Sequence, residues 1–198
     1  MDVVSETRAH RRAAICDAVF QLLAEVGYDK MTMDAVAARA RASKATIYRT
    51  WPDKPSLVAE TLRLKYAEAP HIPDTGSLRG DLMAMMTLAC TLSNSIEGEV
   101  MTGIVSAAVR DAELCDVVRE FAFESKKPMH QFILDLAVAR GELASNDGYE
   151  LLHEVIFAMI TSRKITTNEP LDDEFARHVV DDIVIPLLKH RCAEKAAE

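Results

Sequence analysis

A short run of hydrogen-bonding side chains contains the residues of this chain that are best suited to chemistry. The run extends from Thr32 to Trp51 and holds hydroxyl, ammonium, guanidinium and phenol groups, on Thr32, Arg41, Ser43, Lys44, Thr46, Tyr48 and Arg49. Hydrogen-bond donors and a flat aromatic ring are the groups that meet phosphates and base edges. The run therefore indicates nucleic-acid binding, with a plain helical hairpin that exposes a polar face as the alternative.

Two short helices joined by a tight turn are predicted to position these side chains. Thr32 and Ser43 are both good N-cap residues, because a hydroxyl can accept a hydrogen bond from the unpaired N–H groups of a helix start. Ile47 is the inward anchor of the second helix, which is too short and polar to be stable alone. Two such helices form a helix-turn-helix, whose second helix can enter the major groove of DNA.

The order and spacing of these residues resemble the N-terminal signature of TetR-type transcriptional regulators. The resemblance covers roughly residues 8 to 62 and rests on Thr32, Val36-Ala37, Ser43-Lys44-Ala45-Thr46-Ile47-Tyr48-Arg49, Trp51-Pro52-Asp53-Lys54 and Leu57-Val58. It implies a homodimeric, ligand-released repressor that binds a pseudo-palindromic, double-stranded operator. The DNA-contacting positions that it implies are Lys44, Ala45, Thr46, Tyr48 and Arg49, with phosphates held by Thr32, Ser43 and Lys54.

The turn between the two helices departs from the family pattern. Family members usually have a glycine and a bulky aliphatic residue before the serine, whereas this chain has Arg41 and Ala42. If the turn requires a positive φ at Arg41, a residue with a Cβ carries backbone strain there. The same arginine adds a candidate phosphate contact, so Arg41 joins the predicted DNA-binding residues.

Charge is distributed unevenly along the chain. The net charge is −8, yet the stretch 1–66 holds 11 Lys and Arg against 8 Asp and Glu. An acidic remainder would orient the basic end toward DNA. The apolar fraction of 49% excludes disorder. Since the chain has neither an apolar run of about 18 residues nor the apolar region of a signal peptide, we expect no membrane span and a cytoplasmic location.

Helical periodicity and scarce Gly and Pro predict an all-α fold of about nine helices. Prolines and a glycine between Glu68 and Ser77 mark a boundary. The predicted domains are therefore a three-helix helix-turn-helix domain with a connecting fourth helix, residues 1–66, and a ligand-binding and dimerisation domain, residues 67–198. The helices expected in the second domain span about 78–94, 98–109, 112–140, 147–163 and 172–190.

Two wide apolar stripes near the C-terminus are candidates for pairing with a second copy of the chain. They occupy residues 149–160 and 175–188 within the last two expected helices and include Leu152, Val155, Ile156, Met159, Val180, Ile183, Val184 and Leu187. Burial inside one protomer is the alternative. The family resemblance favours a symmetric four-helix interface, with two helices from each protomer.

Methionines and phenylalanines on several of these helices are candidates for lining a small-molecule pocket. Methionine adapts to irregular ligands, and bundle helices often enclose pockets. The candidate residues are Met83, Met86, Cys90, Met101, Phe121, Met129, Phe132 and Phe157, although ordinary core packing is the commoner explanation for such residues. The resemblance implies an apolar effector of unknown identity. His130 and His153 could add polar contacts or pH sensitivity.

No sequence motif supports catalysis or a metal site. His153-Glu154 begins an H-E-x-x-H pattern, but Phe157 occupies the position of the second histidine. Glycine-rich phosphate loops and nucleophile elbows are also missing from the sequence. Four scattered cysteines suggest isolated thiols rather than a disulfide or metal site. We therefore predict no enzyme and no cofactor; a helical adaptor for a protein partner is the other alternative.

Overall fold

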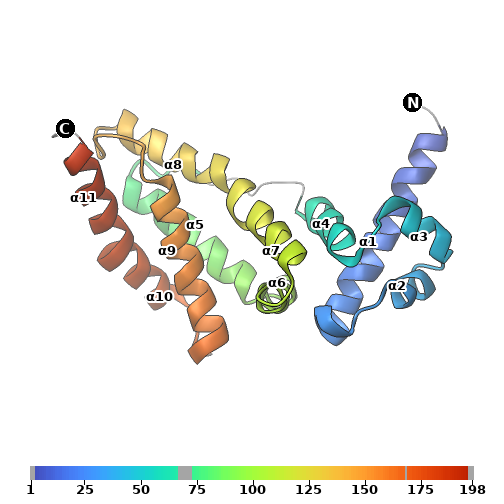
Figure 1. Cartoon of the computed structure of the whole chain (residues 1–198). Coiled ribbons are helices and arrows are strands. Elements are labelled where there is room, and N and C mark those ends of the chain that lie inside the picture. Colours follow the sequence, from blue (N-terminus) through green and yellow to red (C-terminus); the bar gives the residue numbers. More distant parts are fainter. Residues whose placement is uncertain (1–2, 67–72, 168, 196–198) are drawn as a thin grey trace. The chain divides into compact units, whose positions relative to one another are not determined.

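The computed structural model of the chain describes residues 3–66, 73–167 and 169–195 (Figure 1). All regular elements in these ranges are helical, which confirms the predicted all-α fold. The packing of the chain divides it into two compact units, each with its own apolar core. Unit 1 comprises Met1–Glu68 and Glu99–Ala122, and unit 2 comprises Ala69–Gly98 and Phe123–Glu198.

Unit 1 is built around the contact between its first and fourth helices. Its helices are α1 (Val3–Lys30), α2 (Met33–Arg39), α3 (Lys44–Thr50), α4 (Lys54–Lys65), most of α6 (Ile96–Ala108) and α7 (Ala112–Arg119). Helix α4 packs on α1 through one face and on α7 through another. The fully buried Val19, Val36, Ile47 and Leu57 belong to one continuous apolar cluster, which also includes Ile104 and Leu114.

The division by packing does not follow the order of the chain. The segment Glu99–Ala122 packs with Met1–Glu68, although the intervening Ala69–Gly98 belongs to unit 2. Buried Ile104 and Leu114 anchor this segment in the core of unit 1. A sequence pattern indicates which face of a helix is apolar but not which distant helix covers it. The functional division into residues 1–66 and 67–198 remains a proposal.

Helix α1 has a sharp backbone change at Gly27, close to its C-terminal end. The glycine has φ 76° and ψ 170°, a region that is open almost only to glycine, and helical hydrogen bonding continues beyond it to Lys30. Gly27 is thus a kink that is followed by a further turn of helix. It places the buried Tyr28 and Met31 in the unit 1 core.

Unit 2 consists of a bundle in which α5, α8 and α9 all contact one another. Its elements are α5 (Leu78–Ser93), α8 (Lys127–Ala139), α9 (Tyr149–Ser162), the π-helical η2 (Arg163–Thr167), α10 (Asp173–Arg177), the π-helical η3 (His178–Val184) and α11 (Ile185–Lys195). Leu82, Met86, Ile133 and Leu152 form the middle of the core, packed against the C-terminal helices. In the described part of the chain, no helix is both long enough and apolar enough to cross a membrane.

Two of the predicted helices are interrupted. The predicted helix 112–140 divides into α7, the π-helical η1 (Glu120–Glu124) and α8, because Pro128 in the first turn of α8 cannot donate a backbone hydrogen bond. The predicted helix 172–190 contains η3 directly before α11. Pro186, at the second position of α11, lacks an N–H group, and the wider π turn precedes it.

A buried carboxylate fixes the start of α5 to the end of α8. Asp81 is fully buried and accepts hydrogen bonds from the Thr75 N–H (2.8 Å), the Thr75 hydroxyl (2.6 Å) and the Arg140 guanidinium. Burial alone would raise the pKa of Asp81, but the hydrogen bonds from Arg140 and Thr75 outweigh it and lower that pKa. The charge is therefore well compensated.

The backbone at Gly27 gives a first prediction. Gly27→Ala is expected to lower the free energy of unfolding by about 1–2 kcal/mol, because an L-residue is strained at this φ and ψ. No atom lies within 4 Å of the position that a Cβ would take, so a steric clash cannot account for the loss. Urea denaturation measures the change, and an unaltered midpoint would contradict the strained backbone.

Candidate nucleic-acid interface

Hydroxyl groups cap both helices of the predicted helix-turn-helix. Thr32 Oγ1 accepts a hydrogen bond from the Ala35 N–H at 3.1 Å, and Ser43 Oγ accepts one from the Thr46 N–H at 3.2 Å. The Ser43 and Thr46 hydroxyls also lie 2.8 Å apart. The two predicted helix starts are confirmed, and each cap satisfies a donor that the helix itself leaves unpaired.

The turn between α2 and α3 adopts the conformation that the sequence makes costly. Arg41 has φ 49°, the sole positive φ of a non-glycine residue among the described residues. The Arg41 N–H donates to Ala38 O and the Ala42 N–H donates to Ala37 O, which is the hydrogen-bond pattern of a Schellman motif. The turn does place Arg41 at a positive φ, so an arginine carries the strain where glycine would carry none.

Helix α3 buries one residue deeply and leaves the others outward. Ile47 is 0% exposed and fixes the helix to the unit 1 core, whereas Tyr48 is 50% exposed. Lys44, Ala45 and Arg49 are exposed as well, and the Thr46 side chain is half-buried. The residues that were predicted to contact DNA thus share an accessible surface, which we call the α3 face: Lys44, Ala45, Thr46, Tyr48 and Arg49.

Carboxylates within unit 1 already pair with the basic groups next to the α3 face. Lys44 Nζ lies 2.6 Å from Asp34 Oδ2, and the hydrogen bond to Asp34 raises the pKa of Lys44. Arg39 forms a bidentate pair with Glu25, at 2.7 and 2.6 Å. Because these pairs are exposed, they contribute little to stability and can exchange for other anions.

Lys54 makes hydrogen bonds inside unit 1 that the sequence did not indicate. Its ammonium donates to the backbone carbonyls of Tyr28 (2.9 Å) and Met31 (3.2 Å) and lies 3.9 Å from the centre of the Tyr28 ring. Burial lowers the pKa of Lys54. The lysine that was predicted to grip phosphate thus directs two of its three N–H donors to the carbonyl end of α1.

Tyr28 connects this corner to α7, a contact that sequence reasoning missed. The buried Tyr28 hydroxyl donates to Asp111 Oδ2 at 2.8 Å, while Asp111 Oδ1 accepts from the Leu114 N–H and caps α7. Arg110 pairs with Asp29 at 2.8 Å beside it. Because 83 positions separate Tyr28 from Asp111, no local pattern could have indicated the pair.

The predicted ligand-lining residues are distributed over both units. Met101 and Phe121 belong to unit 1, and the other six belong to unit 2. Met86 and Cys90 are buried in the unit 2 core, where they pack against other apolar side chains. Phe132 is 42% exposed. The half-buried residues that remain candidates in unit 2 are Met83, Met129 and Phe157.

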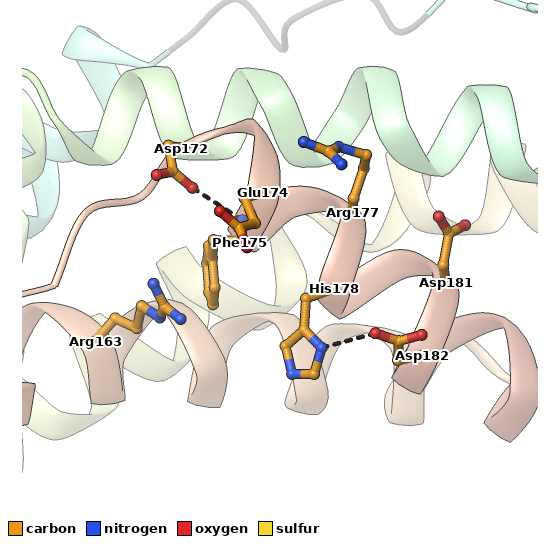
Figure 2. Close-up of a pocket in the computed structure, with 8 residues that line it drawn as sticks. All are labelled: Arg163, Asp172, Glu174, Phe175, Arg177, His178, Asp181 and Asp182. Atoms are coloured by element: carbon orange, nitrogen blue, oxygen red, sulfur yellow. Dashed lines mark hydrogen bonds and ion pairs between the residues drawn. The ribbon is translucent and has the colours of Figure 1, made fainter.

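A charged groove lies on unit 2, between the end of α9 and the α10–η3 segment (Figure 2). Its volume is about 530 Å³ and its lining consists of Arg163, Asp172, Glu174, Phe175, Arg177, His178, Asp181 and Asp182. The Arg163 guanidinium lies 4.4 Å from the centre of the Phe175 ring, and His178 pairs with Asp182 at 2.9 Å. This charged groove differs in character from the expected apolar effector pocket.

Half of the predicted dimer-interface residues are already covered within one protomer. Four of them are buried in the unit 2 core of a single protomer, so the prediction that they face a partner was wrong: Leu152, Ile156, Val180 and Val184. Val155, Met159 and Ile183 are half-buried, and Leu187 is exposed. The surface that a partner could cover is therefore narrower than the two stripes in the sequence.

The described residues give little support to a metal site or to a reactive buried thiol. In the described ranges, no three His, Cys, Asp or Glu side chains gather closely enough to hold a metal ion. Cys16 and Cys90 are buried free thiols, and Cys115 is an exposed one. Burial raises the pKa of the Cys90 thiol to about 11, which makes it unreactive at neutral pH. The Cys192 side chain lies outside the described residues.

Comparison with known proteins identifies the class to which this fold and its α3 face belong. A model for bacterial regulatory proteins of the tetR family matches residues 15–61, and one for a tetracyclin repressor-like C-terminal domain matches residues 72–183. A DNA-binding transcriptional repressor TetR of Mycobacteroides abscessus is 35% identical over 180 residues, 90% of this chain and 94% of that protein. The uncharacterised HTH-type transcriptional regulator YdeS of Bacillus subtilis is 30% identical over 84% of each chain.

Solved structures agree with these relatives. The TetR family transcription regulator SCO0332 superposes with a TM-score of 0.67 at 25% identity, covering 88% of this chain and 98% of that one. The multidrug binding protein EbrR, complexed with proflavin, superposes with a TM-score of 0.60 at 21% identity over 88% and 99% of the two chains. The present chain belongs to the TetR family of transcriptional regulators.

Arg41 gives a second prediction. Arg41→Gly is expected to raise the free energy of unfolding by roughly 0.5–1 kcal/mol, because relief of the positive φ outweighs the added entropy of the unfolded glycine. Arg41→Ala removes the same charge but keeps the strain, so it should not stabilise the protein. Chemical denaturation of both variants is the measurement. Equal stabilisation by alanine would rule out the backbone as the cause.

Lys54 gives a third prediction. Lys54→Met is expected to lower the free energy of unfolding by about 1–3 kcal/mol, because two carbonyls lose their donor. The salt dependence of DNA binding should stay unchanged, whereas each lost phosphate contact would reduce its slope by about 0.9. Lys30→Met, at an exposed lysine near the same corner, is the control for loss of charge. A flatter salt dependence for Lys54→Met alone would restore the phosphate contact.

Proposed function

We propose that the chain is a ligand-released repressor that binds a pseudo-palindromic operator as a homodimer. The observation that carries this proposal is the α3 face, where Ile47 is fully buried and Tyr48 is half exposed on the same short helix. A recognition helix needs this combination, because the core must hold it while its polar side chains reach base edges. The name of the Mycobacteroides abscessus relative supports the repressor assignment.

In this proposal, the α3 face enters the major groove. Tyr48 and Thr46 meet bases and sugars, while Lys44 and Arg49 meet the operator backbone and base edges. Lys44 exchanges Asp34 for a phosphate, since an exposed ion pair is weak. Thr32, Ser43 and Arg41 lie next to phosphates. Symmetric dimers place two recognition helices about one DNA turn apart, roughly 34–36 Å.

Dimerisation is proposed to use the apolar residues of α9 and of the C-terminal segment that remain accessible. These are Val155 and Met159 on α9, Ile183 on η3 and Leu187 on α11. A two-fold axis would place the apolar patch of one protomer against the same patch of its partner. Both protomers then contribute to the interface, so a modest patch on each chain buries twice its own area. The buried parts of both stripes then support the interface from within each protomer.

The effector is proposed to be a small molecule held by unit 2. Half-buried Met83, Met129 and Phe157 supply adaptable and aromatic surface for it. To convert a mostly bound repressor into a mostly released one, the effector must prefer the released conformation by several kcal/mol. A helical adaptor for a protein partner, or an enzyme, would show no sequence-selective DNA binding, which separates both alternatives from this proposal.

The operator can be obtained by selecting genomic DNA fragments with the purified protein. On such a site, Tyr48→Ala is expected to weaken binding by about 10- to 100-fold while leaving the dimer intact. Leu187→Glu is expected to disrupt the dimer instead, because it would place a charge in the apolar interface. The resulting monomer should keep an unaltered α3 face. Fluorescence anisotropy with labelled DNA and sedimentation velocity measure the two properties. A monomeric Tyr48→Ala protein, or no selected site at all, would overturn the proposal.

A further inference from the structure

Two histidines are buried next to each other in unit 2, and the function proposed above assigns no role to either of them. His130 on α8 is 4% exposed and His153 on α9 is 6% exposed. Their ring centres lie 5.2 Å apart. Phe157, one turn further along α9, stacks on His153 with ring centres 5.9 Å apart and an angle of 18° between the planes.

The buried imidazole of His130 contrasts with the buried carboxylate of Asp81 in the same unit. Its Nδ1 is inaccessible to solvent and has no hydrogen-bond partner among the described residues. Asp81, buried in the same unit, has its charge fully compensated by Thr75 and Arg140. An unsatisfied buried polar atom costs about 1–3 kcal/mol, so its presence in a native fold calls for an explanation, and a bound ligand that satisfies the atom is one.

The electrostatic surroundings of His130 are basic. The pKa of His130 is lowered to about 4, mainly by burial, with smaller contributions in the same direction from the nearby His153 and Lys126. Burial also lowers the pKa of His153 and of Lys126, which lies directly before α8. Within the described residues, the charges that act on His130 are therefore those of basic groups, and an anion would be favourable beside them.

We propose that His130 and His153 form the polar end of the effector site and that the effector is an organic acid with an apolar, partly aromatic body. The proposal rests on the function proposed above and names the chemical class of its ligand. Phe157 and the half-buried Met129, one residue before His130, supply the apolar surface beside the histidine pair. A carboxylate oxygen can accept a hydrogen bond from an imidazole N–H, whereas a purely apolar ligand has no acceptor for it.

This chemistry requires a proton. At neutral pH the buried His130 is uncharged, and the acid arrives as its carboxylate anion. When the anion lies beside the imidazole, His130 takes one proton from the solvent and becomes an imidazolium, because the opposite charge favours its protonated form. Binding is therefore coupled to uptake of one proton. The affinity should fall about tenfold for each unit by which the pH rises through the neutral range.

The test uses the full-length dimer with three aromatic acids, benzoate, phenylacetate and cinnamate, each compared with its uncharged amide. We expect at least one acid to raise the melting temperature and its amide to have no effect. Calorimetry in two buffers of different ionisation enthalpy should then show uptake of about one proton per site. His130→Gln and His153→Gln should each weaken acid binding at least tenfold, and His130→Gln should abolish proton uptake. His178→Gln, at an exposed histidine in the same unit, is the matched control and should bind like the unaltered protein.

Three results would overturn this inference: amides that bind as well as the acids, no response to any of the acids, or unchanged proton uptake in His130→Gln. Binding of the selected operator without any acid is measured in parallel, on the same preparations. If the operator binds and the acids do not, only the inference fails. If no operator binds, the proposed function fails, whatever the acids do. Operator binding also verifies that the histidine variants are folded.

Discussion

The burial of one side chain, Ile47, is the constraint on which the DNA-facing end of this protein depends. Helix α3 has only seven residues, which is well below the length at which an isolated helix is stable in water. It persists because Ile47 enters the unit 1 core and the Ser43 hydroxyl satisfies the first turn. A single apolar anchor leaves nearly the whole remaining circumference of the helix available for polar groups. A more apolar helix would be more stable but would present fewer such groups.

A second layer of support lies behind this anchor. Lys54 binds the carbonyl end of α1 and stacks on Tyr28, and Tyr28 reaches Asp111 at the start of α7. Cations at the C-terminal end of a helix are favourable because they oppose its dipole. The corner of the helix-turn-helix is thus fixed by a chain of polar contacts among buried or half-buried groups. In such surroundings hydrogen bonds are stronger than in water.

The parts of this fold that the sequence made predictable are those with local causes. The caps Thr32 and Ser43, the positive φ of Arg41 and the inward position of Ile47 each follow from a few neighbouring residues. The role of Lys54 did not, since its acceptors lie more than twenty positions away. Nor did the buried state of Leu152 and Val184, because an apolar stripe looks the same whether its own protomer or a partner covers it. The histidine pair was visible only as two single residues until α8 and α9 brought them together.

The packing of Glu99–Ala122 against Met1–Glu68 has a consequence for how such a protein can change over evolution. Leu57 and Leu62 on α4 share one apolar cluster with Ile104 and Leu114. A recombination event that exchanged everything after Tyr66 would separate these partners and leave an apolar surface open to water. The helix-turn-helix end is therefore inherited together with Glu99–Ala122. In the function proposed above, new effector specificities are then acquired more easily by substitution within the remaining helices than by exchange of the whole C-terminal region.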